Sequence, residues 1–207
     1  MKAAAIEEAV AAAGLKPVAD PAADLLAQYV ELLLRWNARL NLTAVRDPRQ
    51  IVRRHLLECI QCAQSIPEIG TLLDFGSGAG LPGIPIAIVR PEIRVTLGES
   101  QGKKAAFLRE ALRVLGLKAD IYDRRIENMA AELTFDAVSV RAVDRMDDAA
   151  RVALERIKGG GWLVLFATVT TEQRLKAGLP EITWEDRTPV SSLETGIILL
   201  GRMRCST

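Results

Sequence analysis

A strand followed by a glycine-rich bend is encoded at residues 71–83, which read TLLDFGSGAGLPG. The first five residues are mostly apolar, as expected for a strand that is buried in a sheet. Glycines then follow at positions 76, 78, 80 and 83. Glycine lets the chain turn sharply and brings bare backbone against a ligand, at an entropic cost that a simple turn does not require. The stretch therefore predicts a ligand-binding bend between a strand and a helix.

Short apolar runs alternate with helical stretches on either side of this bend. The expected strands are 71–75, 94–97, 119–122, 135–140, 162–168, 182–185 and 197–200. Expected helices between them include 103–115, which Gly116 ends, and 147–157. Such alternation predicts an α/β fold with a mainly parallel sheet. Because only turn residues separate the last two strands, we expect them to form an antiparallel hairpin at the sheet edge.

The first 66 residues have a different, helical pattern. Asp20-Pro21 and Asp47-Pro48 are each typical of a helix start, with Asp as the N-cap and Pro in the first helical position. The first of these helices carries an apolar stripe that includes Trp36, and we expect that side chain to pack in the core. We therefore expect a helical extension, 1–66, that packs as one unit with a domain formed by residues 67–207.

The composition excludes several classes of protein and of binding site. Apolar residues make up 49% of the 207 residues and the net charge is +1, so any nucleic-acid site must come from a local cluster. No apolar run approaches the roughly 20 residues that span a bilayer, so we expect a soluble, cytoplasmic protein. Cys59, Cys62 and Cys205, with a lone histidine at His55, do not supply the four ligands of a zinc site. We expect free thiols and no metal.

Two kinds of ligand fit the glycine spacing. The pattern Gly78-x-Gly80-x-x-Gly83 matches the fingerprint of dinucleotide-binding domains, with Glu99 about 20 residues further on to bind a ribose hydroxyl. The pattern Asp74-x-Gly76-x-Gly78-x-Gly80 matches the loop of methyltransferases. Gly98, beside Glu99, indicates a close approach of the backbone at this place.

The register of the glycines favours the methyltransferase loop. In a dinucleotide site the first glycine directly follows the strand. Here that residue is Gly76, and its register places Leu81 where the third glycine belongs. Pro82 would also stand where a pyrophosphate rests, whereas a sulfonium ligand needs no anion site at a helix N-terminus. A nicotinamide-dependent oxidoreductase remains the alternative from another enzyme class.

Residues 74–85, DFGSGAGLPGIP, resemble the signature of the glucose-inhibited division protein B family. These proteins are bacterial methyltransferases of guanine N7 in small-subunit (16S) ribosomal RNA. The resemblance covers about residues 20–170 and implies the Rossmann-like fold of S-adenosylmethionine-dependent methyltransferases. Further matching segments are Trp36-Asn37, Asn41-Leu42-Thr43, His55-Leu-Leu-Glu58, Lys103-Lys104, Arg125-Ile-Glu127, Phe135-Asp136 and Arg141-Ala142.

The resemblance also implies a set of S-adenosylmethionine contacts. The bend would line the cofactor, a carboxylate would hold the ribose, two residues after the third strand would face the adenine, and an arginine would sit at the mouth of the site. In that order, these residues are Gly76, Gly78 and Leu81, then Glu99, then Ile126 and Glu127, and finally Arg141.

The implied acceptor needs little catalytic machinery. Guanine N7 has a lone pair and no proton, so no general base is required and we assign no catalytic residue.

A local cluster is expected to bind RNA, namely Arg46, Arg49, Arg53, Arg54 and His55. The expected partner is 16S rRNA or the small subunit, with no membrane, and the protein is expected to be a monomer. Ala167-Thr168 stand where the family often has Lys-Gly, so a non-catalytic RNA-binding protein that retains the fold is a third hypothesis.

Overall fold

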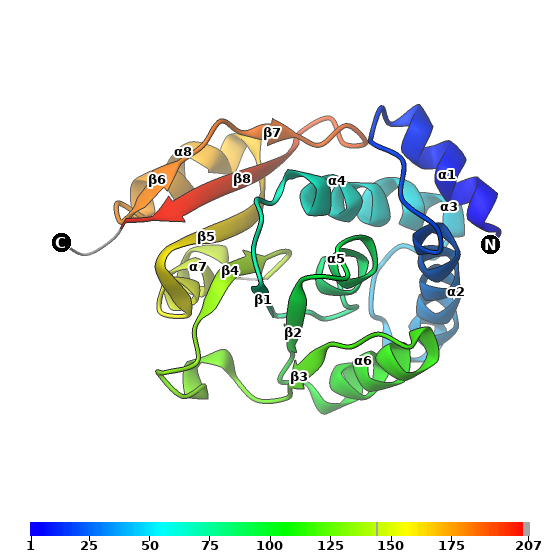
Figure 1. Ribbon diagram of the computed structural model, residues 1–207, viewed down its shortest axis with the longest axis horizontal. Helices are drawn as coiled ribbons and strands as arrows, with labels where there is room; N and C mark the ends of the chain where they lie inside the picture. Colours follow the sequence, from blue (N-terminus) through cyan, green and yellow to red (C-terminus); the bar gives the residue numbers. More distant parts are fainter. Residues whose placement is uncertain (144, 205–207) are drawn as a thin grey trace.

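The computed structural model describes residues 1–143 and 145–204. An eight-stranded sheet lies between helices (Figure 1), in the order β3-β2-β1-β4-β5-β8-β6 with β7 paired to β8. The strands are β1 (Thr71–Phe75), β2 (Arg94–Gly98), β3 (Asp120–Tyr122), β4 (Phe135–Val140), β5 (Ile157–Thr168), β6 (Ile182–Trp184), β7 (Thr188–Pro189) and β8 (Gly196–Met203). The helices are α1 (Ala3–Ala12), α2 (Ala22–Leu40), α3 (Pro48–Ile51), η1 (Val52–Leu56), α4 (Leu57–Ser65), α5 (Gly83–Val89), α6 (Gly102–Leu115), η2 (Ile126–Asn128), α7 (Met146–Leu154) and α8 (Val169–Gly178).

The predicted sheet architecture is confirmed. Strands β3, β2, β1, β4 and β5 are parallel, and β8 pairs antiparallel with β5. Strands β6 and β8 form the expected antiparallel pair at the edge, with β8 inserted between β5 and β6. Because parallel strands point the same way, the carboxyl ends of β1, β2, β3 and β4 all reach one edge of the sheet.

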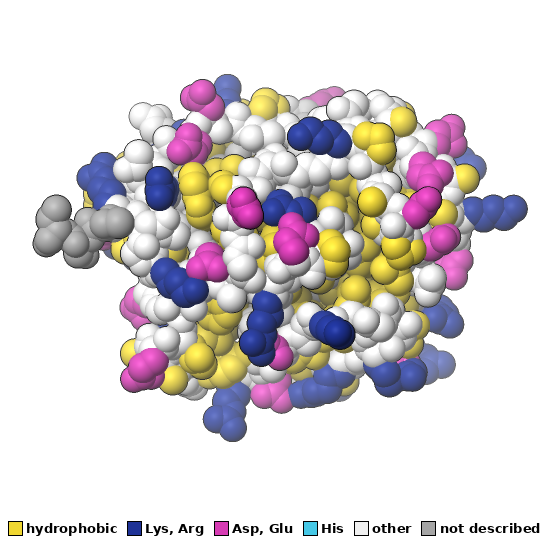
Figure 2. All heavy atoms as spheres, in the orientation of Figure 1, with side chains coloured by type: hydrophobic (Ala, Val, Ile, Leu, Met, Phe, Trp, Pro, Cys, Tyr) yellow, Lys and Arg dark blue, Asp and Glu magenta, His cyan; other side chains and the backbone are white. Residues whose placement is uncertain are grey.

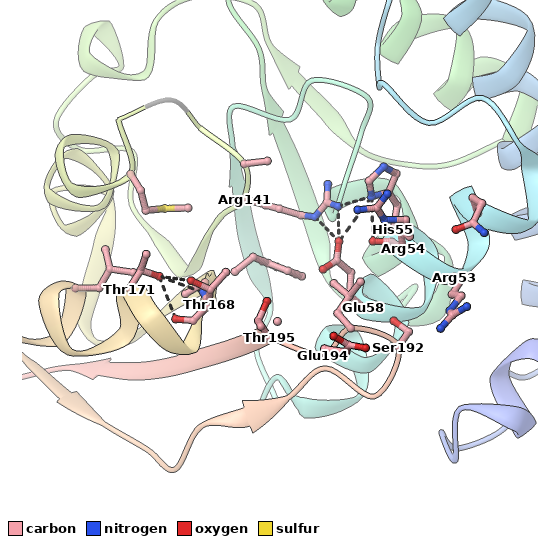
Figure 3. A pocket seen from close by; sticks show the side chains of 18 of the residues that line it. Arg53, Arg54, His55, Glu58, Arg141, Thr168, Thr171, Ser192, Glu194 and Thr195 are labelled. Carbon is pink, nitrogen blue, oxygen red and sulfur yellow. Dashed lines mark hydrogen bonds and ion pairs between the residues drawn. The ribbon is translucent and has the colours of Figure 1, made fainter.

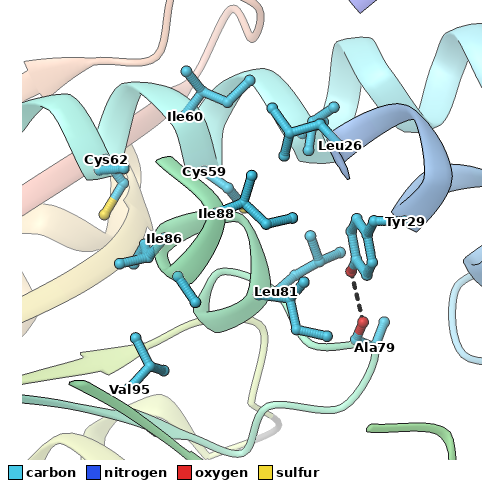
Figure 4. Packing of buried hydrophobic residues seen from close by; sticks show 14 of the residues in the cluster. Leu26, Tyr29, Cys59, Ile60, Cys62, Ala79, Leu81, Ile86, Ile88 and Val95 are labelled. Atoms are coloured by element: carbon cyan, nitrogen blue, oxygen red, sulfur yellow. Dashed lines mark hydrogen bonds between the residues drawn. The ribbon is translucent and has the colours of Figure 1, made fainter. Parts of the chain in front are cut away.

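Two apolar clusters lie on opposite faces of this sheet. Neighbouring residues of a strand alternate between them: Leu72 and Val164 belong to the larger cluster, and Leu73 and Leu163 to the smaller one. The larger cluster also contains buried residues of α1, α2, α4, α5 and α6. Figure 4 shows the part of it that α2, α4, α5 and β2 form. Residues 1–66 therefore share one core with the sheet.

Helix α2 supplies the apolar stripe that the sequence predicts. Leu26, Tyr29 and Leu33 are fully buried, and Trp36 is half-buried, with its ring edge-on to Phe107 at 5.7 Å. The hydroxyl of Tyr29 donates a hydrogen bond to the carbonyl of residue 79 at 2.6 Å (Figure 4). The helical extension thus contacts the glycine-rich bend directly.

The two expected helix starts have different outcomes. Asp47 is the N-cap of α3, where its Oδ1 accepts a hydrogen bond from the backbone N–H of Gln50 at 2.8 Å, as predicted. The expected cap at Asp20 is wrong, because Pro21 occupies the N-cap position and no side chain caps the helix. A turn causes this shift, since the N–H of Ala22 donates to the carbonyl of Ala19 at 2.7 Å.

Some element boundaries also differ from expectation. The helix expected at 147–157 ends at Leu154, and β5 begins at Ile157 rather than at residue 162. A bulge lies between Ile157 and Trp162, where the pairing with β4 shifts register. A Cβ on Gly161 would lie 2.7 Å from the carbonyl oxygen of Asp136, so the glycine allows the strands to approach here.

The helix expected to carry His55 contains a π-helical segment. Residues 48–65 are helical throughout, but η1 is a π-helix between α3 and α4. Such segments are rare and are frequent at functional sites. Downstream, Cys59 and Cys62 are buried free thiols on α4 whose pKa values burial raises, while Cys205 lies outside the described residues.

Helix length and apolar character also bear on membrane insertion. Among residues 1–143 and 145–204, none of the helices has both the length and the hydropathy that crossing a bilayer would take.

Candidate methyl-donor and acceptor site

The bend after β1 requires glycine at several positions. Gly76, Gly78 and Gly80 have positive φ angles of 71°, 54° and 83°, in the left-handed region that other residues rarely adopt. The N–H of Ser77 donates to the carbonyl of Gly98 at 2.9 Å, which ties the bend to the end of β2. The result is a stretch of bare backbone at the carboxyl edge of the sheet.

The side chain of Asp74, near the end of β1, stabilises this bend through hydrogen bonds. Its Oδ2 accepts a hydrogen bond from the N–H of Gly83 at 3.1 Å, and its Oδ1 accepts one from the hydroxyl of Ser139 on β4 at 3.0 Å. Burial raises the pKa of Asp74 to about 6, although these hydrogen bonds offset part of the rise. Asp74 is therefore a structural link between β1, α5 and β4.

Glu99 lies against the bend from the neighbouring strand. Its side chain is buried, Oε2 accepts from the N–H of Gly78 at 2.9 Å, and Oε1 accepts from the N–H of Gln101 at 2.7 Å. These bonds fix the carboxylate next to the backbone of the bend. A carboxylate held in this way can also accept hydrogen bonds from two neighbouring hydroxyl groups of a sugar.

Residues after β3 complete the edge of this site. Ile126 is buried, and a Cβ on Gly98 would lie 2.5 Å from its Cδ1, which confirms the close approach predicted at Gly98. Glu127 is exposed. Leu81 is 5% exposed and belongs to the core (Figure 4), so a ligand could contact only its backbone.

Arg141, at the end of β4, is bound to helix α4. Its Nε donates to Oε1 of Glu58 at 2.8 Å, and its Nη2 donates to the same oxygen and to Nδ1 of His55, the latter at 2.9 Å (Figure 3). The side chains of Arg141 and Glu58 are only 13% and 8% exposed. The guanidinium also lies 5.8 Å from the ring centroid of Phe166.

His55 is neutral in this arrangement. Burial, and then the positive charge of Arg141, lowers the pKa of His55 to about 4. Nδ1 of His55 has two unlike partners: the guanidinium of Arg141, which can only donate, at 2.9 Å, and the carbonyl oxygen of Arg54, which can only accept, at 3.0 Å. Nε2 lies 2.9 Å from Oγ1 of Thr43, a hydroxyl that can donate or accept. His55 therefore contributes no positive charge at neutral pH.

A cavity of about 740 Å³ opens beside Arg141. It lies between the 50–58 segment, the ends of β4 and β5, helix α8 and the 192–196 segment (Figure 3). Residues 141–143 join this cavity to the bend: Arg141 and Ala142 line the cavity, and a Cβ on Gly76 would lie 3.1 Å from Cγ1 of Val143. The cavity and the glycine bend are therefore neighbours.

The structure divides the predicted RNA-binding cluster. Arg53, Arg54 and His55 line this first cavity, whereas Arg49 lines a second one. Arg46 lines neither and donates to Oδ1 of Asn41 at 3.0 Å.

Sequence reasoning missed several polar residues of the first cavity. They come from the end of β5, from α8 and from the segment before β8, more than 110 residues after the arginines in the chain, and the threonine-rich run at 168–171 is the signal that the sequence offers for them. These residues are Thr168, Thr171, Arg174, Ser192 and Thr195. Within the described part of the chain, no three His, Cys, Asp or Glu side chains are grouped in a way that could hold a metal ion.

Comparison with known proteins identifies the family. The model of the GidB family, described as rRNA small subunit methyltransferase G, matches residues 22–193. The chain belongs to this family. Ribosomal RNA small subunit methyltransferase G of Xanthomonas campestris pv. campestris (strain B100) is 46% identical over 160 residues, 77% of this chain and 74% of that protein. The protein of the same description from Stenotrophomonas maltophilia (strain K279a) is 41% identical over 91% of this chain and 88% of its own length.

Solved structures agree on the fold of this GidB family member. P. horikoshii TYW2 in complex with MeSAdo has a TM-score of 0.60 at 16% identity, over 73% of this chain and 63% of that one. The N-methyltransferase NodS from Bradyrhizobium japonicum WM9 has a TM-score of 0.58 at 15% identity, over 77% and 99%. The fold is the Rossmann-like methyltransferase fold, as predicted. The chain is a methyltransferase, the family and fold imply S-adenosylmethionine as its methyl donor, and an oxidoreductase is not favoured.

Proposed function

We propose that this protein transfers a methyl group from S-adenosylmethionine to N7 of a guanine in small-subunit (16S) ribosomal RNA. The observation that carries the proposal is the shared wall between the glycine bend and the first cavity. Residues 141–143 form that wall, so a donor on the bend and a base in the cavity would meet at the end of β4. The descriptions of the relatives supply the class of RNA.

The residues at the bend fit the adenosyl part of the donor. Gly76 and Gly78 offer backbone without side chains, Glu99 offers a fixed carboxylate for the ribose, and the backbone of the buried Ile126 would face the adenine. Glu127 and the backbone of Leu81 border the same site, with Arg141 at its mouth. When bound, the donor supplies a methyl group on a positively charged sulfur.

The first cavity needs only to orient the acceptor base and exclude water. The N7 atom of guanine is already an unprotonated nucleophile, so transfer requires alignment and not proton removal. Glu58 is occupied by Arg141, and Nδ1 of His55 lies against Arg141 and the carbonyl oxygen of Arg54. Neither side chain is therefore placed as a free general base.

The RNA is proposed to bind through local charge. On the face shown in Figure 2, acidic and basic side chains are interspersed and form no single basic patch. Arg53 and Arg54, by contrast, are exposed at the rim of the first cavity, with Arg46 and Arg49 nearby in the chain. We propose that these arginines and His55 contact the rRNA, and that the protein acts as a cytoplasmic monomer without a membrane attachment.

Methyl incorporation tests the proposal. Wild-type protein with labelled S-adenosylmethionine is expected to label 16S rRNA, naked or in small subunits, from cells that lack the gene. Chemical cleavage at N7-methylated guanine should locate the product. If calorimetry detects donor binding but neither substrate gains label, the chain is a non-catalytic RNA-binding protein that retains the fold.

A further inference from the structure

A second cavity, of about 830 Å³, adjoins the first. It lies between α1 and the helical segment formed by α3, η1 and the start of α4, which are near each other in Figure 1. Arg53 and Ser192 line both cavities. These two side chains therefore stand where the cavities meet, and each cavity is large enough to accept a small organic ligand.

The polar groups at this junction lack protein partners. Oγ of Ser192 is buried and has no hydrogen-bond partner among the described residues. A buried hydroxyl without a partner is unfavourable and calls for a ligand or a solvent molecule. Arg53 is exposed, and Figure 3 shows no hydrogen bond or ion pair from it to the other side chains drawn. A hydroxyl and a guanidinium in this state suit a phosphate group.

The wall of the second cavity suits a nucleobase. It is mostly apolar, with alanine side chains of α1 facing Leu34, Val52 and Leu57. The charged residues that line it are Arg49, Arg53 and Glu8, so positive charge is in excess. The guanidinium planes of arginines can stack on the bases of single-stranded RNA and neutralise its backbone. The apolar side chains of this wall would shield such a base from water.

We propose that the second cavity binds the nucleotide adjacent to the methyl acceptor, and that Arg53 and Ser192 bind the phosphate that joins the two nucleotides. This inference rests on the proposed function, because it takes the first cavity as the site of the acceptor guanine. It assigns α1, at the N-terminus, to RNA binding. Recognition then extends over a dinucleotide, with one base on each side of Arg53.

Short RNA probes test this assignment. Binding of guanosine and of the dinucleoside monophosphates GpA and ApG is measured by calorimetry at saturating S-adenosylhomocysteine. At least one dinucleoside monophosphate should bind about tenfold more tightly than guanosine, as expected for one more packed base and one phosphate contact. Arg53→Gln should remove most of that gain, so it should lower the affinity for the dinucleoside monophosphate by a larger factor than the affinity for guanosine. Arg151→Gln, at an exposed position of α7, is the matched control and should change neither affinity.

Two neighbouring positions of α1 separate the second cavity from a general charge effect. Ala12 lines the cavity and Ala11 does not, and both are exposed, so neither substitution disturbs the core. Ala12→Glu places a carboxylate where the phosphate and base are proposed to lie. It should weaken dinucleoside binding several-fold and raise KM for rRNA with little change in kcat. Ala11→Glu, with the same charge, should behave like wild type.

The outcomes distinguish this inference from the proposed function. If dinucleoside monophosphates bind no better than guanosine, or if Arg53→Gln and Ala12→Glu leave both the gain and KM unchanged, the second cavity is not an RNA site. That result is compatible with full methylation of rRNA. Conversely, absent methyl incorporation with intact donor binding overturns the proposed function, and the dinucleoside gain is still measurable.

Discussion

The ion pair between Arg141 and Glu58 joins the end of β4 to α4 in the wall of the first cavity. Burial raises the pKa of Glu58, and the Arg141 guanidinium offsets only part of that rise. Removing one member of a buried pair leaves an uncompensated charge. Glu58→Gln is therefore expected to lower the free energy of unfolding by about 3 kcal/mol, measured by urea denaturation.

A double-mutant cycle isolates this interaction. Arg141→Met combined with Glu58→Gln removes both charges, so the double variant should be more stable than the sum of the single effects indicates. Purely additive effects would mean that the pair contributes no coupling energy and that Arg141 is held by other contacts, such as Phe166.

The carboxylate of Glu99 can be tested apart from the fold. Glu99→Gln retains the shape of the side chain but cannot accept hydrogen bonds from both Gly78 and Gln101 and also from a ribose. We expect S-adenosylhomocysteine to bind about tenfold more weakly, measured by calorimetry. Glu68→Gln, an exposed acid before β1, is the control. Equal affinity of Glu99→Gln and wild type would remove Glu99 from the donor site.

The sequence predicts contacts between residues that are close together in the chain, but not contacts between residues that are far apart in it. The glycine bend and Glu99 could be predicted because a buried strand, its turn and the next strand end follow one another within about 30 residues. The pairing of Arg141 with Glu58 could not, because 83 positions separate them and only the packing of α4 on the sheet joins them. Burial is the main cause of the low pKa of His55, and the charge of Arg141 lowers it further.

Between β1 and α5 the fold tolerates little added volume. A Cβ on Gly83 would lie 2.3 Å from Cδ2 of Leu97 and 2.7 Å from Oδ2 of Asp74, the atom that accepts the N–H of Gly83. Gly83→Ala should lower the free energy of unfolding by about 2 kcal/mol, because both neighbours must move. Thermal unfolding measures the change.

Gly102 provides the contrasting glycine at the start of a helix. An added Cβ there meets nothing within 4 Å, so Gly102→Ala should raise the free energy of unfolding by about 0.5 kcal/mol through a less flexible unfolded chain. Equal effects at Gly83 and Gly102 would show that packing at the bend is not limiting.

Helices and strands with a strong local sequence signal could be predicted. Elements with an irregularity, such as a bulge or a π-helical turn, could not. Strand β4 and the C-terminal end of α6 have the expected bounds, because apolar runs and a left-handed Gly116 mark them. The start of β5 was misplaced, because its lysine and three glycines have low strand propensity and only the bulge opposite β4 accommodates them. The π-helical turn at η1 has no recognised sequence signal.

At the scale of the whole molecule, both cavities join parts of the chain that are distant in sequence. The first unites the 50–58 segment with α8 and the 192–196 segment, and the second unites α1 with α3. The sequence could indicate a local cluster of arginines. It could not indicate that about half of the residues lining the first cavity come from the C-terminal quarter of the chain. The tertiary fold alone brings these segments together.

Several groups with shifted pKa values affect the stability of the whole molecule against acid, and two of them, His55 and Asp74, act in opposite directions. The unfolded chain protonates His55 near pH 6.5 but the folded one only near 4, so His55 lowers the free energy of unfolding as the pH falls through this range. Asp74 does the reverse: the folded carboxyl takes up its proton near pH 6 and the unfolded one near 3.8. Hydrogen bonds from Lys158 and Thr71, against the effect of burial, lower the pKa of Asp136 to about 2, so its contribution lies below this window.

The contributions of His55 and Asp74 should nearly cancel between pH 6.5 and 4.5, while the raised pKa of Glu58 adds stability as the pH falls. His55→Gln removes only the contribution that destabilises on acidification, so acidification should stabilise this variant relative to wild type by on the order of 2 kcal/mol. Urea denaturation at pH 4.5, 5.5 and 6.5 gives the slope of the free energy of unfolding against pH for each protein. Hydrogen bonds that the substitution removes lower this free energy equally at every pH, so they do not affect the difference between the two slopes. Parallel pH profiles for the two proteins would mean that His55 titrates normally in the fold, and that neither its burial nor Arg141 holds it neutral.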